Sequence, residues 1–345
     1  MNVLSRRAGA RAGVVAAALL AVGAVAAPAY ADDTADLEIT FTGTTIAADA
    51  SGKFGAVSLV NHGPSAASGI LVTLDVSALD KTKVTVDETG CDPEAGGKIL
   101  CGIEGDVIAN GADVDWFFPL VKATGATGAA GKVTATIEAE TTDPNPANNT
   151  VTVDVSVGGS GADLSVVAPD VYQWDATNKE YTNKPVVPGG TSRVLVFVEN
   201  DGDQTATGIK LTITLPAHVT FTETEPDCTH KVGDSTTTCE YADAELIPAD
   251  QDKDPAAAPY SWGGFWWSVK VADDVASPST LTGGTATADA MAVPAAAPML
   301  LKSVPTPPEN FIPGTEVKDV DPTDNTDDFS VFVANDLPPA SGGGG

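Results

Sequence analysis

The sequence predicts an all-β protein made of two tandem antiparallel β-sandwich domains. A ten-residue segment at 61–70 (NHGPSAASGI) recurs at 200–209 (NDGDQTATGI), each time between two alternating apolar runs. An Ala-Asp-Leu triplet precedes each copy, and a close cysteine pair, an aromatic triplet and an Asp-Pro turn follow it. The runs have the two-residue period of strands that bury one face. Repetition on this scale indicates two copies of one module.

Each copy contains about seven short segments rich in β-branched and aromatic residues, bounded by Gly, Asp, Asn and Pro. In the first copy we expect strands at 37–41, 54–61, 70–76, 84–86, 114–121, 133–139 and 151–157. In the second copy we expect strands at 164–167, 194–199, 209–215, 219–222, 264–271, 280–288 and 329–333. Short strands with regular turn signals are typical of an immunoglobulin-like sandwich.

The repeats also set the expected domain limits. The first immunoglobulin-like repeat should span 35–157 and the second 162–334, with a flexible Gly/Ser linker at 158–161. The second repeat is longer through insertions near 172–190, 247–260 and 291–318. The last insertion is rich in Pro and Ala, so we expect it to lie outside the sheets. Residues 335–345 should form a flexible Pro/Gly tail.

Residues 1–31 have the features of a signal peptide. Arg6, Arg7 and Arg11 precede an apolar stretch at 14–27, and Ala29 and Ala31 place small residues where a signal peptidase cleaves. We expect cleavage after Ala31 and a secreted or cell-surface protein. A membrane anchor is the alternative, but the run is short for a bilayer. No later apolar run is long enough to span one, so we expect no transmembrane segment in the mature chain.

The charge of the chain limits its partners. Removing the leader deletes three arginines and no acids, so the net charge of -29 becomes -32. Nucleic acid is excluded as a partner, because its binding needs cationic groups that displace counterions from phosphates. A surface protein or a polysaccharide remains possible as a partner.

All four cysteines lie in the exported part of the chain, as two local pairs. Cys91 with Cys101, and Cys228 with Cys239, occupy the same place in the two repeats, so we expect one disulfide within each copy. A zinc site at Cys228, His230 and Cys239 is the alternative. The first copy has no histidine between its cysteines, which weighs against zinc.

The order of these motifs resembles a bacterial surface-protein repeat, the family called "domain of unknown function eleven", which is related to cell-adhesion-related bacterial domains. The resemblance covers 35–157 well and 162–333 more loosely, since Asp203 replaces Pro64 and the second Asp-Pro segment is one residue shorter. It implies an immunoglobulin-like fold, an exported or wall-associated location and no enzymatic activity.

The Asp-Pro segments have a structural interpretation, because Asp and Asn side chains accept hydrogen bonds from backbone amides in turns. The alternative is a calcium site, since oxygen ligands crowd one segment of the second copy. Its candidate ligands are Asp321, Asp324, Asn325 and Asp327. The spacing of an EF-hand loop is absent, and no other cofactor is expected.

Exposed aromatic side chains offer a second kind of binding site. The triplets 116–118 and 265–267 occupy matching positions, and alternate residues of a strand point to opposite faces, so we expect some of these rings in solvent. Rings could stack on sugar faces. The candidate ligand-binding aromatics of the second repeat are Tyr172, Trp174, Tyr260, Trp262 and Trp266.

Motifs of known enzyme classes are missing from the chain, including Gly-x-Ser-x-Gly, His-Glu-x-x-His and a phosphate-binding glycine loop. The sequence therefore favours a non-catalytic exported structural or interaction module. A module that binds carbohydrate or another small ligand through the aromatic insertions of repeat 2 is the first alternative. A secreted hydrolase is the second, and it requires a pocket in which carboxylates converge.

Overall fold

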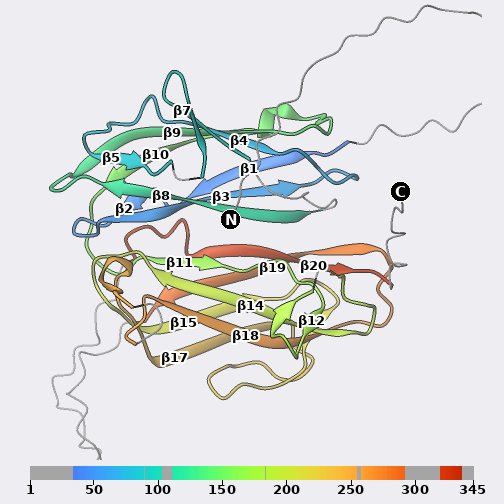
Figure 1. Cartoon of the computed structure of the whole chain (residues 1–345). Coiled ribbons are helices and arrows are strands. Elements are labelled where there is room, and N and C mark those ends of the chain that lie inside the picture. The colour runs from blue at the N-terminus through green and yellow to red at the C-terminus, as the bar shows by residue number, and fades with distance from the viewer. Residues whose placement is uncertain are drawn as a thin grey trace, which may run out of the picture. The chain divides into compact units, whose positions relative to one another are not determined.

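The computed structural model of the 345-residue chain describes residues 34–88, 90–102, 111–182, 184–254, 258–291 and 319–335. Within these ranges the chain forms β-strands and two short 3-10 turns (Figure 1). None of the described helical segments is long and apolar enough to cross a membrane. The signal-peptide prediction lies outside the described residues, as do most of the third insertion and nearly all of the tail.

The N-terminal half of the described chain forms a two-sheet β-sandwich, the first sandwich (Figure 1). One sheet has the order β1-β3-β8-β5 and the other the order β2-β10-β9-β4-β7-β6. All pairs are antiparallel except β10 with β2, which is parallel. The bounds are β1 (Leu37–Thr42), β2 (Thr45–Ile46), β3 (Gly52–Asn61), β4 (Leu71–Asp75), β5 (Val84–Val86), β6 (Asp92–Glu94), β7 (Lys98–Gly102), β8 (Ala112–Lys122), β9 (Gly128–Glu138), η1 (Pro146–Asn148) and β10 (Thr150–Val157).

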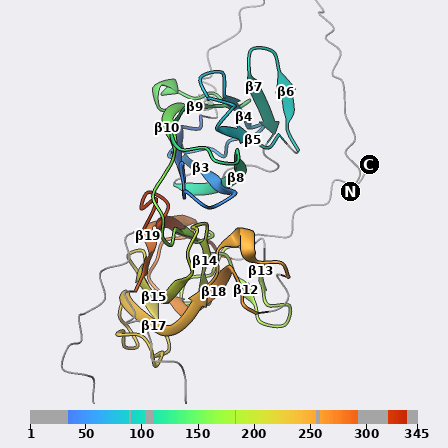
Figure 2. The ribbon, with the colours of Figure 1, turned by 90° about the vertical axis from the view of Figure 1, so that its left-hand side faces the viewer.

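The C-terminal half repeats the plan as the second sandwich (Figure 2). Its sheets have the orders β11-β14-β18-β16 and β17-β15-β19-β20, and the insertion at 172–190 adds a hairpin of β12 and β13. The bounds are β11 (Leu164–Val167), β12 (Trp174–Asp175), β13 (Glu180–Tyr181), β14 (Thr191–Asn200), β15 (Ala206–Thr214), β16 (Val219–Phe221), β17 (Thr236–Leu246), η2 (Ala249–Gln251), β18 (Trp262–Val271), β19 (Ser279–Ala290) and β20 (Thr326–Val333).

Apolar side chains from the facing sheets form one core in each sandwich. In the first sandwich Val57 and Leu59 of β3 pack with Val133 and Ala135 of β9. In the second, Trp267 of β18 is fully buried in a cluster that includes Ile213 of β15. Alternate residues of these strands enter the core, as the two-residue period predicts. The predicted all-β sandwich fold is therefore confirmed.

The strands that the apolar period predicts are present within a few residues at each end. β17 is the main strand that we did not predict. Its sequence TTTCEYADAEL carries few large apolar residues. β17 lies at the edge of its sheet, where one side of the strand and one of its faces are in contact with solvent and can be polar. Backbone pairing with β15 holds this segment as a strand, although its own composition does not predict one.

The recurrent ten-residue segment is a turn built on a buried asparagine. In the second copy Asn200 Oδ1 accepts hydrogen bonds from the amides of Gly202 and Asp163 at 3.1 Å, and its Nδ2 donates to the carbonyls of Gln204 and Leu246 at 2.9 Å. Asn61 makes the matching bonds to the Gly63 amide and the Ser65 carbonyl, both at 2.9 Å. Each asparagine is fully buried, so its side chain replaces water for backbone groups that would otherwise be unsatisfied.

The turn also explains the Ala-Asp-Leu triplets. Leu37 pairs with Asn61, and Leu164 pairs with Asn200, so each triplet lies against its turn. A Cβ on Gly63 would meet the backbone of Ala35 at 2.6 Å, and a Cβ on Gly202 would meet the Asp163 amide nitrogen at 2.7 Å. Glycine is therefore required where the two segments approach.

We predict that Asn200→Ala destabilises the protein by about 2–4 kcal/mol, because it leaves the buried Gly202 and Asp163 amides and the Leu246 carbonyl without their partner. Chemical denaturation of the folded chain measures this change. Asn178→Ala is the control, since Asn178 is exposed and bonds only within its own turn to Asp175. A loss for Asn200→Ala no larger than that of the control would contradict the role assigned to the buried amide.

Candidate functional site

A buried lysine lies where the two sandwiches meet. Lys53 Nζ is 2.8 Å from Asp163 Oδ2 and 2.8 Å from Asp324 Oδ2, and 3.6 Å from Asp321 Oδ2. Its side chain is fully buried. Lys53 lies near the start of β3, whereas its three partners belong to the second sandwich and the segment that leads into β20. The cluster therefore ties the first sandwich to the second by buried charge.

The charges of this cluster decide its protonation. Burial alone would lower the pKa of Lys53, but the charges of Asp324, Asp163 and Asp321 outweigh it and raise that pKa above its ordinary value. Burial raises the pKa of Asp163 and of Asp324, although Lys53 partly offsets it. Burial also raises the pKa of the neighbouring Asp201 to about 6. One ammonium thus lies among more carboxyls than it can neutralise.

Acidic side chains of the second repeat also cap backbone amides of the first. Asp321 Oδ2 accepts a hydrogen bond from the Thr45 amide at 2.7 Å. Asp203 Oδ2 accepts a hydrogen bond from the Asp49 amide at 3.0 Å. The loop around 250, part of the insertion at 247–260, brings Asp250 to the Ser51 amide at 3.1 Å. These bonds follow one edge of the first sandwich, so the insertion contributes to the junction.

The four calcium candidates have protein partners in the structure. Asp321 and Asp324 face Lys53, Asn325 Nδ2 donates to the Ala288 carbonyl at 3.0 Å, and Asp327 Oδ2 accepts from the Ala168 amide at 2.6 Å. Asp321 Oδ1 also accepts from the Thr323 hydroxyl, which is the turn bonding expected of an Asp-Pro segment. Within the described ranges no group of three or more His, Cys, Asp or Glu is arranged for a metal ion. A lysine ammonium supplies the positive charge at this segment.

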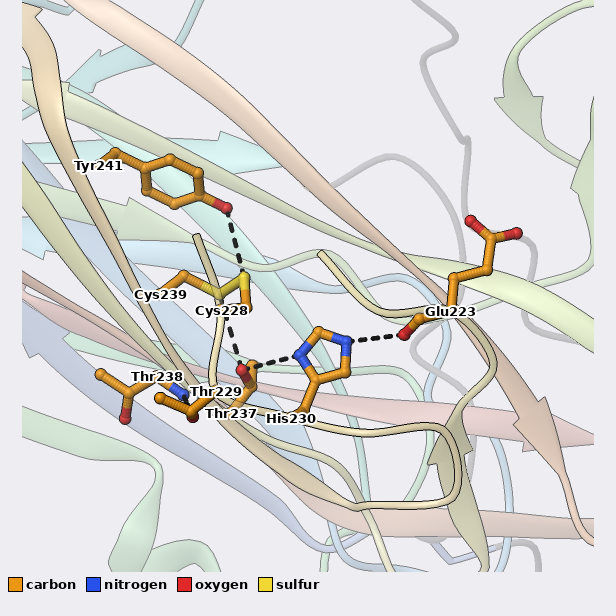
Figure 3. The surroundings of a disulfide bond; sticks show 8 residues. All are labelled: Glu223, Cys228, Thr229, His230, Thr237, Thr238, Cys239 and Tyr241. Carbon is orange, nitrogen blue, oxygen red and sulfur yellow. Dashed lines mark hydrogen bonds between the residues drawn. A yellow bond between two sulfur atoms is a disulfide. The ribbon is translucent and has the colours of Figure 1, made fainter. Parts of the chain in front are cut away.

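The four cysteines form the two local disulfides, Cys91–Cys101 and Cys228–Cys239, as predicted. Figure 3 shows the second bridge with His230 beside it. His230 Nδ1 lies 2.9 Å from the Thr237 hydroxyl and its Nε2 lies 2.8 Å from the Glu223 carbonyl oxygen. Both sulfurs are in the bridge and both ring nitrogens have partners, so these residues do not offer the free thiolates of the zinc alternative.

The aromatic triplets alternate between core and solvent. Trp267 is buried, whereas the adjacent Trp266 is 57% exposed. Phe118 is likewise buried and the adjacent Phe117 is 38% exposed. The expectation that some rings of each triplet reach solvent is therefore confirmed, and the pleat of β8 and β18 is the reason.

The five candidate aromatics of the second repeat fall into two groups. Tyr172 packs on Phe332 with ring centroids 4.7 Å apart, and Trp174 packs edge-on to Tyr181 with Arg193 above its ring. Tyr260, Trp262 and Trp266 are exposed. Trp262 and Trp266 lie on the outward side of β18, whereas Tyr172 and Trp174 hold the insertion at 172–190 against the sandwich.

A cleft of about 400 Å³ lies beside the lysine cluster. Its floor includes the outward side of β1, β3 and β8 in the first sandwich, where Ala56 pairs with Phe117 and Ser58 pairs with Asp115. Its other wall comes from β11, β14, β18 and the start of β20. Four partly exposed aromatic rings line it, namely Phe54, Phe117, Phe197 and Trp262.

Carboxyl groups converge in the same cleft. Its lining includes Asp115, Glu199, Asp324, Asp327 and Asp328, and no Lys, Arg or His among the described residues. Burial raises the pKa of Asp115, and the charge of Asp328 adds to it. Burial and then the charge of Asp115 raise the pKa of Asp327. The cleft is therefore an acidic and aromatic site, and the charge of Asp328 acts on both Asp115 and Asp327.

Sequence reasoning selected Trp262, Asp324 and Asp327 but missed the rest of this site. Lys53 could have been found, because it occupies a core-facing position in a strand whose other core-facing residues include Val57 and Leu59. Phe54 and Phe197 could also have been found, because they are large apolar residues at solvent-facing positions of β3 and β14, where the two-residue period predicts polar residues. No signal in the sequence shows that these positions meet.

No family model matches this chain, and no curated protein matches it. Solved structures with similar folds include an activated α-2-macroglobulin of Escherichia coli, at 12% identity and a TM-score of 0.27 over 88% of this chain and 22% of that one. A variant of BcpA, the major pilin subunit of Bacillus cereus, is similar at 9% identity and a TM-score of 0.29, over 87% of this chain and 69% of that one.

The SafD adhesin of Salmonella is similar at 14% identity and a TM-score of 0.22, with 36% of this chain and 99% of that chain covered. This chain spans about a fifth to a third of the length of the macroglobulin and transglutaminase structures that it resembles. At these TM-scores the similarities carry no inference about function, which must come from the site.

We predict that the free energy of unfolding falls as the pH rises from about 4 to about 6. Native Asp201 keeps its proton up to about pH 6, whereas the unfolded carboxyl loses it near 3.8, so the native state binds more protons in this window. This one group contributes roughly 3 kcal/mol to the fall. Asp163 and Asp324 act in the same direction, because their pKa values are also raised.

Denaturant titrations at a series of pH values measure this slope. Asp201→Asn should flatten it, because an amide does not titrate, while its carbonyl can still accept the bond from the Ser165 hydroxyl. Asp154→Asn should leave the slope unchanged, since Asp154 is exposed. A stability that rises with pH across the window would show that these carboxyls are ionised in the folded chain.

Proposed function

We propose that the chain is a non-catalytic exported module in which two immunoglobulin-like sandwiches act as one rigid extracellular unit. The observation that carries this proposal is the buried Lys53 cluster, because its 2.8 Å ion pairs to Asp163 and Asp324 join the two repeats. Opening the junction would break both ion pairs together with the bonds from the Thr45, Asp49 and Ser51 amides to acidic side chains of the second repeat. A rigid tandem unit can hold a binding surface at a fixed distance from the cell.

Export is supported by the two disulfides, which persist in oxidising compartments. Membership of the family "domain of unknown function eleven" is part of the proposal. The turn, triplet and cysteine motifs that suggest it are each tied to the fold by hydrogen bonds and pairings seen in both copies.

A non-catalytic role is favoured by how the clustered carboxyls are used. Asp327 is bound to the Ala168 amide and Asp324 is paired with Lys53, so both have structural duties in the folded protein. The cleft does meet the requirement of convergent carboxyls that a hydrolase has. Catalysis by a pair of acids also needs one of them free to move its proton to a substrate, and the two most buried acids are held by the protein.

Lys53→Met tests the rigid unit. We expect the wild-type chain to unfold in one calorimetric transition, and the variant to lose about 3–5 kcal/mol and to unfold in two, because the carboxyls then lack their cation. Lys132→Met is the matched control, since Lys132 forms an exposed pair with Asp154 at 2.6 Å and should lose less than about 1 kcal/mol. Two separate transitions in the wild-type chain would refute the rigid unit.

Carbohydrate binding is the second candidate function, and exposed rings on the outward side of β18 favour it. Leu195 of β14 pairs with Trp266, and Phe197 pairs with Gly264, so the rings of Phe197, Trp262 and Trp266 share one face. Phe197 and Trp262 have ring centroids 6.5 Å apart. Exposed ring faces are suited to stacking on sugar rings.

A glycan array tests this second candidate. We expect any glycan that binds to lose about tenfold in affinity to Trp266→Ala, which removes the most exposed ring without touching the core. Tyr260→Ala is the control, because Tyr260 is exposed but lies before β18. No binding above background, or equal binding by Trp266→Ala, counts against a sugar platform.

A further inference from the structure

The cleft beside the lysine cluster has the composition of a ligand site. Its volume of about 400 Å³ lies within the range of small-molecule sites. Rings on opposite walls line it, with Phe54 and Phe117 from the first sandwich and Phe197 and Trp262 from the second. Each of these rings is between 38% and 44% exposed, so each has surface left for a ligand.

A buried polar atom beside the cleft has no hydrogen-bond partner. Asp324 is only 5% exposed, its Oδ2 is paired with Lys53, and its Oδ1 is buried with no donor. Asp324 also lines the cleft. A buried acceptor without a donor is costly, so a ligand that brings a hydrogen-bond donor would relieve that cost.

The charges of the cleft select the sign of the ligand. Burial raises the pKa of Asp115 and of Asp327, and repulsion by the charge of Asp328 adds to it in both cases. No cationic side chain is among the described residues of the lining. A positive ligand reduces this repulsion, whereas an anion increases it and a neutral sugar leaves it unchanged. The aromatic walls favour a cation with apolar surface over a bare metal ion, since rings attract ammonium groups through their faces and bury the attached methylenes.

We propose that this cleft binds an alkylammonium group, supplied either by a free diamine or by a lysine side chain of another molecule. The ammonium would donate to Asp324 and Asp115, and its alkyl chain would lie between the rings of Phe117 and Trp262. The site depends on the fixed arrangement of the two sandwiches that the proposed function describes, because its walls come from both. The proposed site gives the rigid two-sandwich unit a specific class of ligand, the alkylammonium group.

Isothermal titration calorimetry of the mature chain at pH 7 and low salt tests the site. Cadaverine represents a free diamine, and Nα-acetyl-lysine methylamide represents a lysine side chain. 1,5-Pentanediol is the neutral control of similar length, and magnesium chloride at matched ionic strength is the control for a bare cation. We expect binding of at least one amine, no binding of the diol, and proton release on binding, seen as different heats in phosphate and Tris buffers.

Three variants locate the binding. Asp115→Asn and Asp328→Asn should each weaken amine binding by about tenfold, because each removes one charge from the cleft. Trp262→Ala should weaken it by about fivefold through the lost ring. Trp266→Ala is the matched control, an exposed tryptophan on the same strand that does not line the cleft, and it should bind as the wild type does.

Each outcome decides the proposal. Binding of cadaverine alone identifies a free diamine, and binding of the lysine amide at least as tightly identifies a protein side chain as the source. Absence of amine binding, equal binding of the diol, full displacement by magnesium, or unchanged affinity in both aspartate variants overturns the site. If the same sample still unfolds in one transition, the rigid unit stands and the ligand site alone is refuted.

Discussion

The buried ammonium of Lys53 is the interaction on which the arrangement of the two repeats depends. A lysine taken out of water is unfavourable unless carboxylates and their geometry replace its hydration, and here Asp163 and Asp324 do so at 2.8 Å. Asp163 belongs to the Ala-Asp-Leu triplet of the second copy, and Asp324 follows its Asp-Pro turn. One side chain of the first repeat therefore reaches two separate segments of the second repeat. The junction cannot open without breaking these ion pairs.

The cleft is a consequence of that junction. Because the lysine cluster fixes the outward side of β1, β3 and β8 near β11, β14 and β18, rings that would be isolated surface residues come to face one another across about 400 Å³. Burial at this place raises the pKa of Asp115 and of Asp327, and the charge of Asp328 adds to it in both cases. Part of the strong acidity of the chain is thus concentrated at one place. The acidic cleft shares Phe197 and Trp262 with the row of rings that includes Trp266, but Trp266 itself does not line the cleft.

The two repeats show how one motif can serve two purposes. Asn61 and Asn200 make the same local hydrogen bonds, and Gly63 and Gly202 allow the same close approach to the preceding triplet. These hydrogen bonds and close approaches form within each repeat and do not depend on the other repeat. The aspartates of the triplets differ, because Asp36 is half-buried at the surface of the first sandwich, whereas Asp163 is buried against Lys53. The insertion at 247–260 likewise has a use only in the assembled chain, where Asp250 caps the Ser51 amide.

The sequence by itself determined the local structure of this protein. The period of two predicted the strands, the repeated asparagine turn predicted two modules, and the spacing of Cys91, Cys101, Cys228 and Cys239 predicted the disulfides, because strands, turns and short rings are governed by neighbours along the chain. It also flagged the aromatic triplets, since the pleat must send adjacent rings to opposite faces. Only the tertiary structure decided that Lys53 meets Asp163 and Asp324, and that Phe54 and Phe117 face Phe197 and Trp262. Those contacts join residues at least 80 positions apart, and their energies depend on burial and distance, which a linear pattern does not contain.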